Sequence, residues 1–272
     1  MKKTLSTFML AIFIGLIIFS GCKKKGDPPE IPPQETFSMD FSQFPEANQK
    51  MAGKIAADTT NNNWAFSILT VGFWQLVVTV NMVVPVLAFA ESFNHEAKYV
   101  HKDGGKWKWE YNINDNVGNT YTAKLYGQID GDQVYWEMYI SKSGDYTDFL
   151  WYDGISKLDN TQGTWTLYKA PTNPVEYVDI EWHRNNDGTS DVKYTNVEPN
   201  SNGNGGYIYY GLTNDPDFNA FYDVYVIESN NLSEIRWNTT GYYGRVRNQT
   251  YFGDNEWHCW NNLLEDADCG SI

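Results

Sequence analysis

From about residue 98 onward, apolar and polar side chains alternate along the chain with a period of two residues. The clearest run is Trp107, Trp109, Tyr111 and Ile113, which are separated by single polar residues. Successive side chains of a β-strand point to opposite faces, so this alternation is typical of a strand with one buried and one solvated face. The pattern recurs at 121–129, 134–140, 165–167, 178–182, 192–194 and 235–237. Such a chain has to fold mainly as β-sheet.

Turn-forming residues separate these segments. Clusters of Gly, Asn, Asp and Ser lie at 103–105, 130–132, 187–188, 202–206 and 229–231. Short turns of this kind join antiparallel neighbours, so the sequence predicts about ten strands in an antiparallel up-and-down meander. One face of this meander would be apolar and has to be covered. We expect the meander to form a strongly curved sheet or a barrel.

A long uncharged stretch precedes the strands. No charged residue occurs from 59 to 90, and residues 64–80 are mostly apolar on every side. Length alone would permit a transmembrane helix at 64–84, which stays open as an alternative, although Gln75, Thr79 and Pro85 interrupt the apolar character. An all-round apolar helix is also typical of a protein core. We expect it to pack on the concave face of the sheet, with Pro85 kinking or ending it.

The N-terminus has the pattern of an export signal. Lys2 and Lys3 precede an apolar run from 8 to 19, and small residues follow. This arrangement is typical of a secretory signal peptide. The segment Phe19-Ser20-Gly21-Cys22 resembles the lipobox of bacterial lipoproteins. The resemblance implies cleavage before Cys22 and acylation of that cysteine, which would anchor the protein stably in a lipid bilayer.

The residue after Cys22 bears on the location of the protein. In lipoproteins an Asp at that position often marks retention in the inner membrane, and this chain has Lys23 there. The resemblance therefore implies the outer membrane, on its periplasmic side or at the cell surface.

These interpretations divide the chain into four parts. Residues 1–21 are a signal peptide, and 22–40 are the lipidated cysteine with a proline-rich tether. Residues 41–97 are a helical segment that contains the apolar helix, with a further short helix expected at about 45–58. Residues 98–272 are the β-meander. The tether has four prolines between 28 and 33, which favour an extended spacer.

Two cysteines remain once Cys22 is lipidated. Cys259 and Cys269 lie close together near the C-terminus. In an oxidising compartment such a pair is typical of a single disulfide. A single membrane crossing at 64–84 would place both cysteines in the reducing cytoplasm, which argues against that alternative.

Charge and motifs exclude several classes of function. The chain has 34 acidic and 20 basic side chains, a balance that argues against nucleic acid as a partner. We find no nucleophile elbow, phosphate loop, dinucleotide motif or metal-ligand spacing, and expect no catalytic residue, cofactor or metal. Glu110, Glu137 and Glu181 occupy polar strand positions typical of surface charge, although two of them on adjacent strands could serve a glycosidase. The sequence favours a non-enzymatic protein.

Aromatic residues supply the candidates for ligand binding. Most of the eleven Trp and nineteen Tyr are expected in the core. Some fall on either face of their strands and could contact a ligand: Trp151, Tyr152, Tyr207, Tyr209, Tyr210, Tyr242 and Tyr243. One hypothesis is a membrane-anchored binding or structural module for a lipid or another apolar molecule. The other is a surface lipoprotein that binds or processes glycans through exposed rings and paired carboxylates.

Overall fold

The structure is a computed structural model that describes residues 26–38, 44, 60–102, 104–115 and 117–272, with the backbone alone at 73–81. The helices are η1 (Gln34–Thr36), α1 (Asn62–Asn81), α2 (Val83–Ser92), η3 (Ile227–Ser229), α3 (Gln249–Phe252) and η4 (Cys269–Ser271). The strands are β1 (Lys98–Val100), β2 (Lys106–Asn114), β3 (Thr120–Asp130), β4 (Gln133–Lys142), β5 (Tyr146–Lys157), β6 (Gln162–Ala170), β7 (Asn173–Arg184), β8 (Ser190–Asn196), β9 (Tyr207–Leu212), β10 (Ala220–Val226), β11 (Asn231–Trp237), β12 (Gly244–Arg247), β13 (His258–Trp260) and β14 (Asp266–Ala267).

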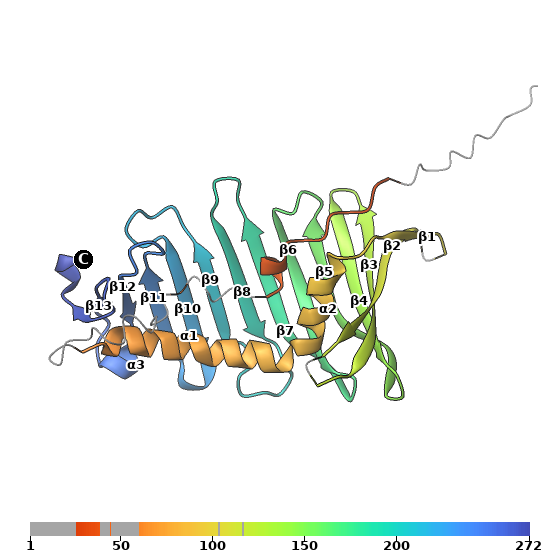
Figure 1. Ribbon diagram of the computed structural model, residues 1–272. Coiled ribbons are helices and arrows are strands. Elements are labelled where there is room, and N and C mark those ends of the chain that lie inside the picture. The colour runs from red at the N-terminus through yellow and green to blue at the C-terminus, as the bar shows by residue number, and fades with distance from the viewer. Residues whose placement is uncertain (1–25, 39–43, 45–59, 103, 116) are drawn as a thin grey trace, which may run out of the picture.

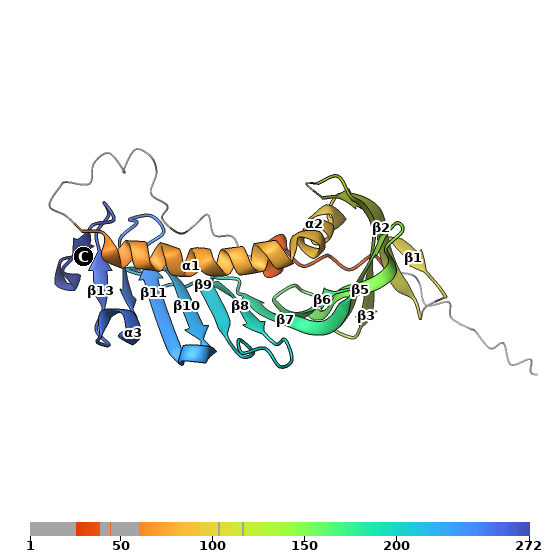
Figure 2. The ribbon, with the colours of Figure 1, turned by 90° about the horizontal axis from the view of Figure 1, so that it is seen from below.

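All fourteen strands belong to one antiparallel sheet whose spatial order follows the sequence from β1 to β14 (Figure 1). The predicted meander is therefore confirmed. Helices α1 and α2 lie on the same face of the sheet, as the view from below makes clear (Figure 2). Most side chains on that face are buried, and those on the opposite face, here called the open face, are half-buried or exposed. Strand β2 shows the alternation, since Trp107, Trp109, Tyr111 and Ile113 are buried and their neighbours are not.

The expectation of a strongly curved sheet or a barrel is wrong. In the part of the chain that the structure describes, β1 and β14 each pair on one side only, so the sheet is open. The reason is that α1, α2 and the segment 26–38 already cover the apolar face. A sheet covered by another layer does not need to close on itself to exclude water.

The apolar helix forms where it was expected, but the break falls earlier. Helix α1 ends at Asn81, and Met82, with φ −118° and ψ 13°, separates it from α2. Pro85 does not end a helix; it lies in the first turn of α2, where its missing N–H costs no intrahelical bond. In the described residues, neither α1 nor any other helix combines the length and the apolarity needed to cross a membrane.

Two clamps hold the covering layer on the sheet. Near the N-terminus, Phe37 is fully buried, with its ring 4.6 Å from those of Phe89 on α2 and Tyr152 on β5. At the other end, Asp266 on β14 accepts the backbone N–H groups of Asn62 (3.2 Å) and Asn63 (2.9 Å) at the start of α1. The start of α1 is therefore capped by a residue from the last strand.

The predicted disulfide is confirmed: Cys259 and Cys269 are bonded, with their Cα atoms 5.2 Å apart. Cys22 and the helix expected at 45–58 lie outside the described residues. Of the proposed tether, residues 26–38 are described, and Pro29, Ile31 and Phe37 in them are buried.

The buried face has a regular packing pattern across β2 to β6. Trp107 pairs with Gly127, which pairs with Trp136, which pairs with Gly154, which pairs with Trp165. Large rings therefore alternate with glycines from strand to strand. The Trp136 ring lies over Gly127 and the Trp165 ring over Gly154, which lets these indoles pack on neighbouring strands without collision.

Candidate functional site

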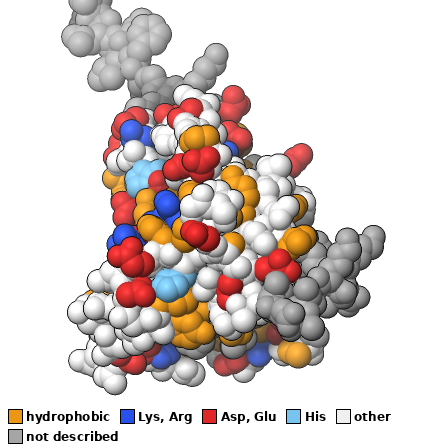
Figure 3. Space-filling view, turned by 90° about the vertical axis from the view of Figure 1, so that its left-hand side faces the viewer, with side chains coloured by type: hydrophobic (Ala, Val, Ile, Leu, Met, Phe, Trp, Pro, Cys, Tyr) orange, Lys and Arg blue, Asp and Glu red, His pale blue; other side chains and the backbone are white. Residues whose placement is uncertain are grey.

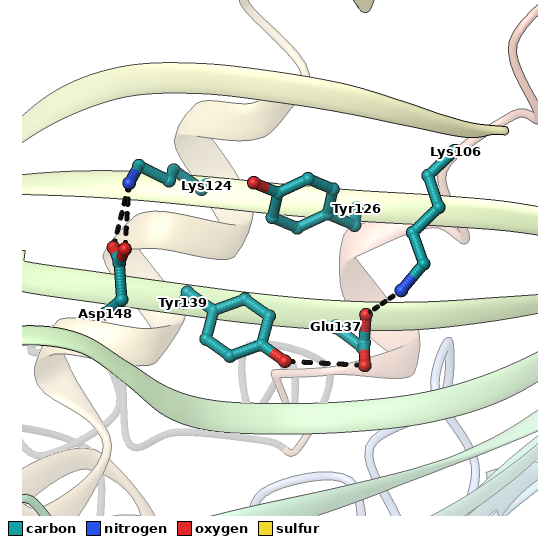
Figure 4. Close-up of a pocket in the computed structure, with 6 residues that line it drawn as sticks. All are labelled: Lys106, Lys124, Tyr126, Glu137, Tyr139 and Asp148. Carbon is teal, nitrogen blue, oxygen red and sulfur yellow. Dashed lines mark hydrogen bonds and ion pairs between the residues drawn. The ribbon is translucent and has the colours of Figure 1, made fainter. Parts of the chain in front are cut away.

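The open face has a groove of about 340 Å³ over β2 to β5, lined by Lys106, Lys124, Tyr126, Glu137, Tyr139 and Asp148 (Figure 4). All six come from polar positions of alternating strands or from the bulged start of β5. Cross-strand register brings them together, since Tyr126 pairs with Glu137 and Lys124 pairs with Tyr139. Four strands therefore contribute to one site.

Two ion pairs border the groove. Lys106 Nζ lies 2.5 Å from Glu137 Oε2, and Lys124 Nζ lies 2.9 Å from Asp148 Oδ1. Ser141 Oγ also donates a hydrogen bond to Asp148, at 3.0 Å. These side chains are partly exposed, so the pairs contribute little to stability. Their effect is to hold charged groups at defined positions on the surface.

Two tyrosine rings lie between the ion pairs. The rings of Tyr126 and Tyr139 are nearly perpendicular, at 80°, with centroids 5.9 Å apart. Tyr139 Oη donates to Glu137 Oε1 at 3.4 Å, and Lys106 Nζ lies 5.9 Å from the centroid of the Tyr126 ring. Figure 4 shows both rings between the two lysines. The groove therefore combines apolar ring surface with fixed donors and acceptors.

The environment keeps the groups of one pair charged. The hydrogen bond from Lys124 lowers the pKa of the Asp148 carboxyl, and the same bond raises the pKa of Lys124. Burial, followed by the charge of Glu137, raises the pKa of Tyr139. Near neutral pH the groove therefore presents ammonium, carboxylate and phenol groups together.

A second carboxyl lies next to Glu137. Asp153 on β5 is the cross-strand partner of Glu137. Burial raises the pKa of Asp153, and the charges of Glu137 and Glu176 add to this effect. Two adjacent carboxyls can accept hydrogen bonds from neighbouring hydroxyl groups of one ligand, because each has two acceptor oxygens.

The aromatic residues predicted from the sequence do not form one site. Trp151 and Tyr152 are buried under the covering layer, and Tyr210 stacks on Tyr222 on the same face. Tyr207 and Tyr209 do lie half-buried on the open face, but on β9, at a distance of several strands from the groove. Tyr242 is exposed in the loop before β12, and Tyr243 beside it packs its ring against Phe218.

Five residues of the groove were not predicted from the sequence: Tyr126, Tyr139, Lys106, Lys124 and Asp148. A signal was present, because Tyr126 and Tyr139 occupy polar positions of strands joined by the turn at 130–132. An aromatic residue at a polar strand position is left partly exposed. Aligning the two strands about their turn would have placed these rings near each other.

No metal centre accompanies the groove: within the described ranges, no three His, Cys, Asp or Glu side chains lie close enough together to hold an ion. Comparison of the chain with models of known protein families, with curated proteins and with solved structures found no match.

Proposed function

We propose that the protein is a membrane-anchored, non-enzymatic glycan-binding protein whose binding surface is the open face of the sheet. The observation that supports this proposal best is the pair of half-buried rings, Tyr126 and Tyr139, between the ion pairs Lys106–Glu137 and Lys124–Asp148. Sugars present C–H faces that stack on aromatic rings and hydroxyl groups that bond to charged donors and acceptors. The groove supplies both kinds of contact at once.

The depth and polarity of the groove favour a sugar over an apolar molecule. The groove is shallow and four of its six lining residues are charged, whereas sites for apolar ligands are enclosed and mostly hydrophobic. A glycan chain lying across the strands would meet further half-buried rings at Tyr207 and Tyr209 on β9. An elongated ligand suits an elongated, open surface.

The membrane anchor is proposed from the sequence of residues 19–22. Acylation of Cys22 would place the domain at a bilayer, in the outer membrane as the residue that follows it implies. Cys22→Ser tests this part: in the native host, the variant should lose incorporation of labelled fatty acid and move from the membrane to the soluble fraction. Unchanged labelling and sedimentation would contradict the anchor.

The binding proposal is tested with the purified full chain on an array of oligosaccharides, followed by calorimetry on the ligands retained. Tyr126→Ala and Tyr139→Ala should each weaken binding about fivefold or more, since an aromatic contact is worth roughly 1 kcal/mol. Tyr135→Ala is the matched control, because Tyr135 is an exposed tyrosine on the same strand as Tyr139 but outside the groove.

The control should bind with wild-type affinity. Wild-type protein that retains no oligosaccharide, or whose binding is the same in Tyr126→Ala, Tyr139→Ala and Tyr135→Ala, would contradict the proposed function.

One observation favours a second candidate, the binding of an apolar molecule. A groove of about 490 Å³ lies between residues 28–31, the end of α2 and β2, and Pro28, Pro29, Ile31, Phe93, Trp107 and Trp109 line it together with Glu30, Ser92, His95, Glu96 and Ala97. Phe93 is 45% exposed there. A fluorescent fatty acid should bind the wild-type full chain, and Phe93→Asp should weaken this binding. Equal fluorescence changes with both proteins would exclude this candidate.

A further inference from the structure

Three of the four arginines of the chain lie on two neighbouring strands at the other end of the open face. Arg236 is on β11, and Arg245 and Arg247 are on β12. Arg236 and Arg245 are direct cross-strand partners. Like charges in directly opposite positions destabilise a sheet, so this arrangement has to be compensated by nearby groups.

Two of the three arginines have their own carboxylates. Arg236 Nη1 donates to Asp223 Oδ1 at 2.6 Å. Arg247 donates two hydrogen bonds to Glu234, through Nε and through Nη2, the latter at 2.9 Å. Their charges are therefore neutralised within the sheet.

Arg245 differs from both. Among the described residues its guanidinium has no ion pair and no hydrogen bond, and its Nε atom is buried without a partner. The nearby Asp215 accepts the backbone N–H groups of Asp217 and Phe218 with Oδ1. Asp215 and Asp217 attract Arg245 electrostatically, but neither forms an ion pair with it within 4 Å. Because Nε is buried, a ligand would have to reach the guanidinium through its Nη groups, which form no ion pair with the described residues.

Two aromatic rings hold this guanidinium in place. The Cζ atom of Arg245 lies 4.2 Å from the ring centroid of Phe218 and 4.4 Å from that of Trp257. Trp257 also lies 4.7 Å from Arg247 Cζ. A guanidinium clamped between rings loses little further freedom on binding, and its planar fork of N–H donors matches the two oxygens of an oxyanion.

The surroundings of Arg245 oppose long-range attraction of an anion. Figure 3, which views the molecule from the end that carries the C-terminus, shows acidic side chains scattered over that surface and fewer basic ones. The chain as a whole has a net charge of −14. This negative charge repels an anion at long range, so an oxyanion bound here has to be held by direct contact with Arg245.

We propose that Arg245, clamped by Phe218 and Trp257, binds an oxyanion group, the carboxylate or sulfate of an acidic glycan. The oxyanion accepts from the Nη groups of the guanidinium, which have no ion-pair partner among the described residues. The glycan as carrier rests on the proposed function, because the site shares the open face with the Tyr126–Tyr139 groove. The inference adds that the glycan is acidic.

The test titrates the full chain at low salt with hexagalacturonate, which has carboxylates, with dextran sulfate, and with neutral dextran. Arg245→Gln should weaken binding of an acidic chain at least about tenfold, because a charge-assisted bidentate contact is lost. Arg245→Lys retains the charge without the fork and should fall between Arg245→Gln and wild type. Arg184→Gln is the matched control, since it removes an equal charge from an exposed arginine at the end of β7.

A second readout does not depend on variants. With four arginines in the chain, the Nε–H resonances are few enough to follow by nitrogen–proton NMR. Addition of the acidic chain should shift the Arg245 resonance and leave that of Arg184 in place. An unshifted Arg245 resonance, or equal losses of affinity in Arg245→Gln and Arg184→Gln, would overturn the inference.

The outcomes also separate this inference from the proposed function. If only hexagalacturonate binds, the oxyanion recognised by Arg245 is a carboxylate. If only dextran sulfate binds, it is a sulfate. If glycans bind through Tyr126 and Tyr139 but neither acidic chain binds better than dextran, the proposed function stands and this inference fails. If inorganic sulfate shifts the Arg245 resonance while no glycan binds, the oxyanion site stands and its glycan carrier fails.

Discussion

Trp260 lies so close over Gly244 that a Cβ atom at the glycine would come within 2.2 Å of Trp260 Cζ2. Gly244 is also the cross-strand partner of Trp237 on its other side. The alternation of indole and glycine seen across β2 to β6 is therefore repeated at β11 to β13. Several indole rings of this sheet therefore pack over glycine backbone.

Gly244→Ala should lower the free energy of unfolding by about 1–3 kcal/mol, the usual cost of overpacking a core. Denaturant titration measures it. Gly72→Ala is the control and should raise the free energy of unfolding, because a Cβ at Gly72 in α1 meets nothing within 4 Å. Alanine also favours helix by roughly 1 kcal/mol over glycine. Equal stability of Gly244→Ala and wild type would contradict the close packing.

The capping of α1 by Asp266 gives a second prediction. Asp266→Ala removes the acceptor of the Asn62 and Asn63 N–H groups and should cost about 1 kcal/mol, the usual worth of a helix cap. Hydrogen exchange at these two amides should accelerate. Asp268→Ala is the control, because Asp268 has the same charge and caps only η4. Unchanged exchange at Asn62 and Asn63 in Asp266→Ala would show that the cap is not formed in solution.

Loss of the disulfide should loosen the same end of the molecule. Cys259→Ser with Cys269→Ser opens a short loop and should lower the free energy of unfolding by about 2.5–3 kcal/mol. Asn63 Nδ2 donates to the carbonyl of Cys259, so protection of the start of α1 should fall as well. Denaturation of wild type with and without reductant checks this, and superimposable curves would refute it.

Asp115 predicts a dependence of stability on pH. Its carboxylate accepts hydrogen bonds from Asn119 and Tyr121 and from backbone N–H groups, and the Asn119 side chain in particular lowers its pKa to about 2. The unfolded chain takes up this proton at higher pH than the folded protein. The stabilisation is therefore complete above the ordinary pKa of about 3.9 and is lost as the pH falls toward 2.

Asp115→Asn should consequently be less stable than wild type at pH 7, and the difference should shrink between pH 4 and pH 2. Denaturant titrations across this range measure the difference in free energy of unfolding between the two proteins. Asp130→Asn removes an equal charge at the exposed end of β3 and should show no such convergence. A difference in free energy of unfolding that stays constant down to pH 2 would mean that these hydrogen bonds do not stabilise the Asp115 carboxylate.

The sequence predicted the parts of the fold that depend on neighbouring residues. The alternation at 107–113 is a strand, the uncharged stretch is helical, and Cys259 pairs with Cys269, because these features depend on side-chain periodicity or on a short loop. Closure of the sheet was predicted wrongly. The sequence pattern shows that an apolar face needs cover, but it does not show whether the cover is a helix or more sheet.

The groove was not predicted because it depends on register. Lys106 and Glu137 are far apart in sequence, and only the pairing of β2 with β3 and of β3 with β4 brings them within 2.5 Å. A shift of one residue in either pairing would move one of them to the buried face. The sequence places each residue on a face; the pairing decides which residues are neighbours.

By itself, the sequence determined the class of fold, the antiparallel order of its strands and the disulfide, since each follows from local periodicity, turn residues or short loops. Only the tertiary structure decided that the sheet stays open, that Trp136 lies between two glycines, and that Arg245 lies against Phe218 and Trp257 without an ion-pair partner among the described residues. These features depend on contacts between residues distant in sequence. Such contacts form only when the covering helices and the register of all strands are set together.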